Sequence, residues 1–128
     1  MRTTLSIAES IAKDVKRAGK RLATAQTELI EQLQKGYRLD TGMTDRLIRE
    51  EAMVSLWTGV ERALQIESEK TGDAEEAART AIAKGRERAL QIVLNGPVES
   101  TSLSRRAKGD IEVEAARVFY RDLQGYED

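Results

Sequence analysis

The fold is decided by the stretch TLSIAESIAKDVKRAGKRLATAQTELIEQLQ, residues 4–34. Its apolar residues recur at alternating steps of three and four: Ala8, Ile11, Val15, Ala18, Leu22, Ala25 and Leu29. That spacing is a heptad seam, and it predicts one long amphipathic helix over about 4–34. The next seam position is Gln32, so the pattern decays there, and Gly36 is a suitable C-terminal stop.

Three further blocks of helical periodicity follow, over about 44–70, 74–94 and 110–123. The first of these can be capped by Thr44 or Thr41. The second opens with Asp73 and has Glu76 three residues on, which is a capping-box arrangement. Because glycine and proline stop a helix, Gly72 and then Asn95-Gly96-Pro97 are expected to end the first two blocks.

The C-terminal third is the least regular part of the sequence. Residues 98–109 are Ser-rich and basic without a clear period, so we expect an ordered loop or a short helical turn there. Asp110 is then expected to cap the last helix, and the final Gly-Tyr-Glu-Asp to fray.

Composition supports the same fold class. The chain has 128 residues, which predicts one domain, and 40% of them are hydrophobic while only 4% are aromatic. Such a core must be built from aliphatic residues and Ala, and a single proline leaves long helices uninterrupted. We therefore predict an all-α bundle of four or five mostly antiparallel helices, with Trp57 in its core.

One hexapeptide occurs twice, as Glu-Arg-Ala-Leu-Gln-Ile at 61–66 and again at 87–92, each time with a glycine two residues before it. The repeat fits a duplicated unit, a coincidence among good helix formers, or two similar helices packed together. The two glycines, Gly59 and Gly85, lie inside predicted helices, as does Gly19. Each costs a helix about 1 kcal/mol relative to alanine. Close approach of helix backbones is the expected reason for keeping them.

Two residue types are missing, and their absence excludes whole classes of chemistry. The chain has no cysteine and no histidine. Histidine bases, Ser-His-Asp triads and His- or Cys-ligated zinc are therefore excluded. No phosphate-binding glycine loop is present, and the adjacent acidic pairs Glu50-Glu51 and Glu75-Glu76 do not share a helix face. We expect no enzyme, no cofactor and no metal site.

The best local signal for function is a basic stripe on the first helix, made of Lys13, Lys16, Arg17, Lys20 and Arg21. At about 100° per residue these side chains share one face, roughly opposite the apolar seam. Such a stripe suits nucleic-acid phosphates or an acidic protein, or it is simply a solvated face. An anionic membrane fits poorly, because the apolar side is Ala-rich and lacks Trp and Phe.

A second basic cluster is Arg105, Arg106 and Lys108, which precedes the last predicted helix. The arrangement weakly resembles a helix-turn-helix element. However, the following helix opens with Ile-Glu-Val-Glu, whose carboxylates would face phosphates, so that interpretation is not adopted.

These observations favour a non-enzymatic, nucleic-acid-associated accessory or regulatory protein that binds phosphates through the basic face of the first helix, with Arg105, Arg106 and Lys108 as further candidate contacts. The alternative is a protein-binding adaptor, assembly factor or inhibitor that acts through helix–helix contacts. A helix of about 30 residues spans about 45 Å, which is long for a chain of this size. We therefore expect a coiled-coil homodimer through the heptad seam. Nothing approaches the ~18 apolar residues of a membrane span, so a cytoplasmic location is expected.

Overall fold

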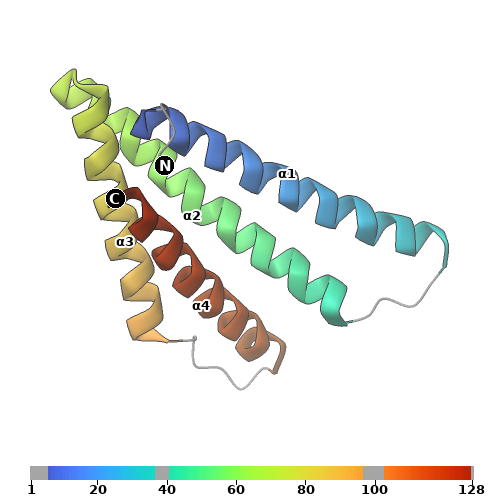
Figure 1. The fold of residues 1–128 in the computed structure, drawn as a ribbon. Helices are drawn as coiled ribbons and strands as arrows, with labels where there is room; N and C mark the ends of the chain where they lie inside the picture. The colour runs from blue at the N-terminus through green and yellow to red at the C-terminus, as the bar shows by residue number, and fades with distance from the viewer. Residues whose placement is uncertain (1–5, 37–40, 97–102, 128) are drawn as a thin grey trace.

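The computed structural model describes residues 6–36, 41–96 and 103–127. They form four α-helices and a short 3-10 helix: α1 (Ile7–Gln34), α2 (Thr41–Thr71), α3 (Ala74–Asn95), α4 (Leu103–Gln124) and η1 (Gly125–Glu127). Within these residues there is no β-strand. The predicted all-α bundle is confirmed (Figure 1).

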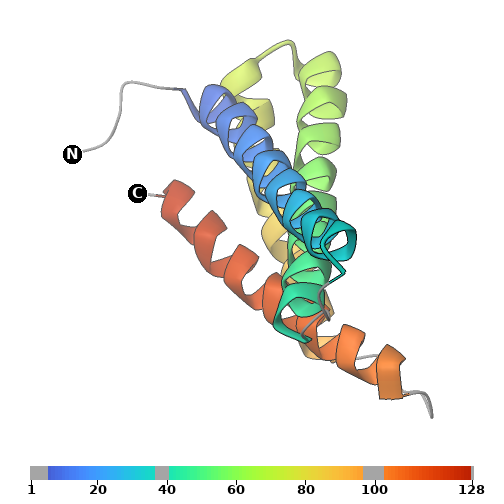
Figure 2. The same ribbon diagram turned by 90° about the vertical axis from the view of Figure 1, so that its right-hand side faces the viewer.

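The helices alternate in direction, and α2 is the central one because it packs extensively against each of the other three, whereas α3 touches α1 only lightly. It runs antiparallel to both α1 and α3 (Figure 1). On the far side of the bundle α4 returns along α3 and α2, and η1 ends near the start of α1 (Figures 1 and 2). Neighbours in the chain are thus neighbours in space, as short connections require.

The helix starts are fixed by side-chain caps. Ser6 Oγ accepts a hydrogen bond from the backbone N–H of Glu9 at 3.1 Å, and its hydroxyl donates to the Glu9 carboxylate. Asp73 Oδ1 accepts from the backbone N–H groups of Glu75 and Glu76, as the sequence predicts. The other half of the expected capping box is supplied by Thr71, whose Oγ1 accepts from the Asp73 N–H. Such caps satisfy backbone donors that a helix leaves unpaired at its start.

The core lies where α2, α3 and α4 meet, and α1 adds Ile11 and Ala18 to it. Phe119 is fully buried and makes an edge-on contact with Trp57, with ring centroids 5.0 Å apart and planes at 84°. The core position predicted for Trp57 is confirmed, since its exposed fraction is 5%. Edge-to-face rings add to the stabilisation that burial gives.

Of the three helix-interior glycines, Gly85 sits at a tight contact between helices, whereas Gly59 faces the end of a flexible side chain. A Cβ added to Gly85 would lie 2.7 Å from Val60 Cγ2 and 3.0 Å from Leu123 Cδ1. One added to Gly59 would lie 2.7 Å from the Arg88 guanidinium. Gly19 is different, because nothing lies within 4 Å of the added atom. The expected close approach is therefore not made at Gly19 within one chain.

The repeated hexapeptide lies on the antiparallel pair α2 and α3, which pack against each other. Its two copies have different surroundings. Leu64 is half-buried whereas its counterpart Leu90 is exposed, and Ile66 is exposed whereas Ile92 is half-buried. The structure thus shows two similar helices packed together, with different faces turned inward.

Several predicted boundaries are wrong. The last helix begins at Leu103, so Asp110 lies inside α4 and does not cap it. The helix continues through Gly109 because that residue is buried in the bundle, where packing offsets its poor helix propensity. The second helix begins at Thr41, which leaves Thr44 within it. The expected tail at 125–127 is a 3-10 turn, and the part of the predicted loop at 98–102 lies outside the described residues.

The heptad seam of α1 is used within the chain. Ile11, Ala18 and Ala25 have exposed fractions of 0%, 8% and 3%. Since α1 packs mainly on α2, the seam is already covered by the same chain. A homodimer would have to use another side of α1.

Burial thins out toward the α1–α2 connection. We call α1 from Ala23 to Gln34 and α2 from Thr41 to Glu51 the hairpin end. Among its described side chains, Ala25 is the buried one. The hairpin end projects away from α3 (Figure 1), so each of its helices has few neighbours.

Candidate nucleic-acid interface

The structure divides the five basic residues predicted on α1 into two groups, although all five are exposed. Lys13, Lys16 and Lys20 point away from α2, and none of them forms an ion pair with a described residue. We call these three the lysine face. Arg17 and Arg21 lie further round the helix and line a cleft toward α4. We call Arg17 and Arg21 the arginine edge. The predicted stripe is therefore divided into the lysine face and the arginine edge.

The cleft beside the arginine edge holds acidic side chains as well. It has a volume of about 440 Å³, with Met53 and Trp57 among its lining residues. Asp14, Glu50 and Asp122 also line it. Asp14 lies 3.8 Å from the Arg17 guanidinium. The arginines are thus partly neutralised by their surroundings, and the lysines are not.

Tyr126 closes one end of this cleft. Its hydroxyl donates a hydrogen bond to the Asp14 carboxylate, and its ring lies 6.2 Å from that of Trp57. Burial raises the pKa of Tyr126 above its usual range, and the bond to Asp14 raises it further. A phenol held protonated in this way does not supply a base near neutral pH. Through these contacts Tyr126 attaches η1 to α1.

Asp122 lies across the cleft from the arginines, and desolvation raises its pKa while Arg121 and Arg21 oppose that change. It forms no ion pair with a described residue. Asp14 and Asp122 were missed by the sequence analysis, and Tyr126 was expected to lie in a fraying tail. Their contacts join residues more than a hundred positions apart, which no local pattern records.

The second predicted basic cluster does not join the first. The side chains of Arg105 and Arg106 lie outside the described residues, and Lys108 is exposed near the start of α4. That end of α4 is far from the lysine face, because α4 starts at the opposite end of the bundle from α1 (Figure 1). On α3, Lys84 is paired with Glu67 at 2.6 Å.

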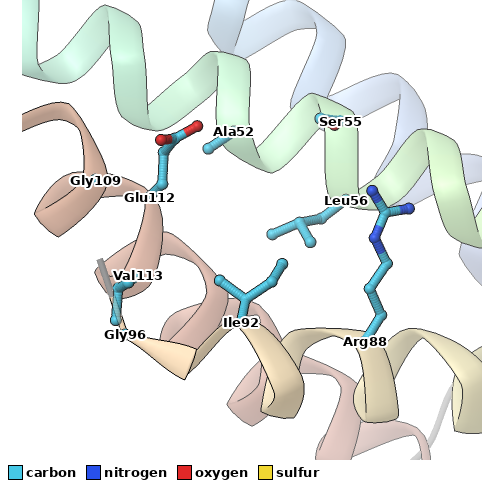
Figure 3. A pocket seen from close by; sticks show the side chains of 9 residues that line it. All are labelled: Ala52, Ser55, Leu56, Arg88, Ile92, Gly96, Gly109, Glu112 and Val113. Atoms are coloured by element: carbon cyan, nitrogen blue, oxygen red, sulfur yellow. The ribbon is translucent and has the colours of Figure 1, made fainter. Parts of the chain in front are cut away.

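An apolar groove lies between α2, α3 and α4, with a volume of about 260 Å³. Leu56 and Ile92 point into it from facing helices, and Arg88 and Glu112 stand at its edges (Figure 3). Pockets for whole small molecules are usually about 300–1,000 Å³. This groove is therefore sized for one or two side chains.

Two kinds of feature are absent from the described residues. No helix there is long and apolar enough to cross a membrane. Nor do three or more carboxylates gather there in a way that could hold a metal ion.

Comparison with models of protein families, with curated proteins and with solved structures gives no match.

Proposed function

We propose that the protein is a non-enzymatic nucleic-acid-associated accessory protein that binds phosphates through the lysine face of α1. The observation that carries the proposal is the set of three exposed lysines without an ion-pair partner among the described residues. From Lys13 to Lys20 they span about 10 Å of helix axis, roughly three phosphate steps along one strand. Arg17 and Arg21 would contribute less, because carboxylates neighbour them.

Electrostatic binding of this kind has a measurable signature. Three phosphate contacts predict a slope of log affinity against log salt of about −2.7 on duplex DNA. Between 50 and 200 mM salt the affinity should then fall about 40-fold. The proposal includes no base-specific readout, so affinities for unrelated sequences should agree.

The test is fluorescence anisotropy with labelled duplex and single-stranded oligonucleotides at both salt concentrations. Changing Lys13, Lys16 and Lys20 together to Gln should abolish binding. A matched control removes the same charge elsewhere, with Arg62, Lys70 and Arg117 changed to Gln, and should bind nearly as well as the wild type. Absence of binding by the wild type at low salt would refute the proposal, as would an equal loss in the control.

The apolar groove of Figure 3 favours a second candidate function. A protein partner could insert one or two apolar side chains between Arg88 and Glu112, as an adaptor or inhibitor surface would require. Changing Val113, which lines the groove and is half-buried, to Glu should then remove a stoichiometric partner after nuclease treatment. Retention of that partner by the Val113→Glu variant would exclude the groove as its binding site.

We also infer a cytoplasmic location, which the absence of cysteine supports. Cell fractionation that places the protein elsewhere would contradict it. The homodimer stays part of the proposal, with its contact moved from the seam to another side of α1.

A further inference from the structure

A second stripe of residues runs along α1 beside the buried seam. Its members each follow a seam position by one residue, about 100° further round the helix. They are Ala12, Lys16, Gly19, Ala23, Gln26, Ile30 and Leu33, and all are exposed. We call this set the outer stripe. The exposed fractions of Ile30 and Leu33 are 53% and 57%, which is high for large apolar side chains.

Nothing described in the chain covers the outer stripe. Gly19 has open space around an added Cβ, so its cost to the helix has no explanation within one molecule. Ile30 and Leu33 lie on the hairpin end, which projects from the body of the bundle (Figure 1). The arginine edge and its cleft are on the other flank of α1, toward α4. The outer stripe is therefore open along its length.

The charges of α1 indicate what covers this stripe. Beside the outer stripe, residues 13–21 present the three lysines of the lysine face, whereas the far half presents Glu31, since Glu28 is already paired with Arg46 at 2.6 Å. A second α1 in parallel would place like charges together. In the antiparallel direction each basic half meets an acidic half, and a second copy of the chain has this complementary distribution by construction.

We propose that two copies of this chain pair through the outer stripes of their α1 helices, antiparallel and crossing near Ala23. The small residues Gly19 and Ala23 then lie at the centre, where the backbones come closest. Ile30 and Leu33 cover the Lys16 stem and Ala12 of the other copy. Lys16 faces Glu31 of the other copy, once on each side of the twofold axis.

In the dimer Lys16 pairs with Glu31, so the phosphate-binding residues become Lys13 and Lys20 of both copies, and the salt slope of about −2.7 applies to the monomer. These four lysines lie on one outer side of the dimer, opposite the α2 helices. The two basic patches lie about 20 Å apart along the paired helices. That consequence rests on the proposed nucleic-acid function, whereas the pairing itself does not.

The test is sedimentation equilibrium of nuclease-treated protein over roughly 1–200 µM, which reports association without nucleic acid present. The wild type should dimerise. Changing Ile30 and Leu33 to Asp should give a monomer with unchanged helical circular dichroism. The control changes Ile66 and Leu94, which are exposed on other surfaces, to Asp and should still dimerise. A monomeric wild type, or a dimer that survives the Ile30 and Leu33 changes, overturns the proposal.

A charge exchange tests the direction of pairing. Lys16→Glu and Glu31→Lys should each weaken the dimer severalfold, and the two changes together should restore it. Failure of the double variant to recover would overturn the antiparallel arrangement. Because sedimentation and anisotropy are separate readouts, loss of nucleic-acid binding with an intact dimer would count against the proposed function alone.

Discussion

The bundle body and the hairpin end are made from the same kind of sequence, yet they differ in burial. In the body, Leu56, Val60 and Phe119 have exposed fractions of 6%, 1% and 0%. In the hairpin end, Leu29 and Leu47 continue the apolar pattern but are only half-buried. The difference lies in the number of neighbouring helices. In the body each helix packs against several others, whereas in the hairpin end α1 and α2 pack mainly against each other.

This comparison separates the residues that stabilise the fold from the exposed residues that are available to bind a partner. Most helix stability in proteins comes from tertiary packing of an apolar face. The body satisfies that requirement within the chain. The outer side of α1 does not, and there the lysine face and the outer stripe lie together. Variants that affect one region and spare the other will therefore show whether the division is real.

The largest expected effect is at the centre of the body. Phe119→Ala should lower the free energy of unfolding by about 3–5 kcal/mol, because it empties a fully buried site against Trp57. Leu33→Ala in the hairpin end should change it by no more than about 0.5 kcal/mol. Urea denaturation followed by circular dichroism measures both, and similar losses at the two sites would erase the distinction.

Glycine-to-alanine changes should have opposite signs in the two regions. Gly85→Ala forces a Cβ against Val60 and Leu123, and should destabilise the protein by about 1–3 kcal/mol. Gly19→Ala adds a methyl group in open space and should stabilise it by about 1 kcal/mol. Thermal melts of dilute protein would decide this, and the same sign for both would contradict the structure.

Tyr126→Phe tests the contact that joins η1 to α1. Loss of the hydrogen bond to Asp14 should cost about 1 kcal/mol at neutral pH. Because the folded pKa of Tyr126 is raised, its contribution is complete below the unfolded value of 10.0 and is lost as pH rises above it. Wild-type stability should fall in that range more steeply than that of the variant. If the wild type and the variant gave parallel curves of stability against pH, the hydrogen bond between the Tyr126 hydroxyl and Asp14 would be contradicted.

The smallest effect is expected at an ion pair on the edge of the body. Lys84 donates to Glu67 at 2.6 Å, and this bond lowers the pKa of Glu67 below its usual 4.5. Lys84→Met should reduce stability only slightly, since exposed ion pairs contribute little. The difference from wild type should shrink as pH falls below 4.5, where the unfolded carboxyl is protonated. A large loss, or one that does not depend on pH, would show that the lysine stem acts through packing.

Much of this fold could be predicted from local pattern. The heptad spacing gives α1, and the cap at Asp73 gives the start of α3, because both depend on residues close in sequence. The start of α4 could not be predicted in this way. In the sequence Gly109 resembles a loop residue. The structure shows instead that it is buried inside the bundle, in the wall of the groove that Leu56 also lines.

The sequence predicts which basic residues form the candidate site, but it does not predict which other side chains lie beside them. Helical periodicity places all five basic residues of α1 on the exposed side. It does not reveal that Arg17 and Arg21 share a cleft with Asp14 and Asp122, while the three lysines form no ion pair with a described residue. That division depends on how α4 and η1 return beside α1, which is a tertiary fact.

Native-state hydrogen exchange tests the division between body and hairpin end most directly. In dilute protein, where the chain is monomeric, amides of residues 26–34 and 43–51 should exchange much faster than those of residues 78–89 and 113–123. At concentrations that support the dimer, protection should rise over residues 26–34 and change little in the body. Equal protection of the two regions in the monomer would contradict the account.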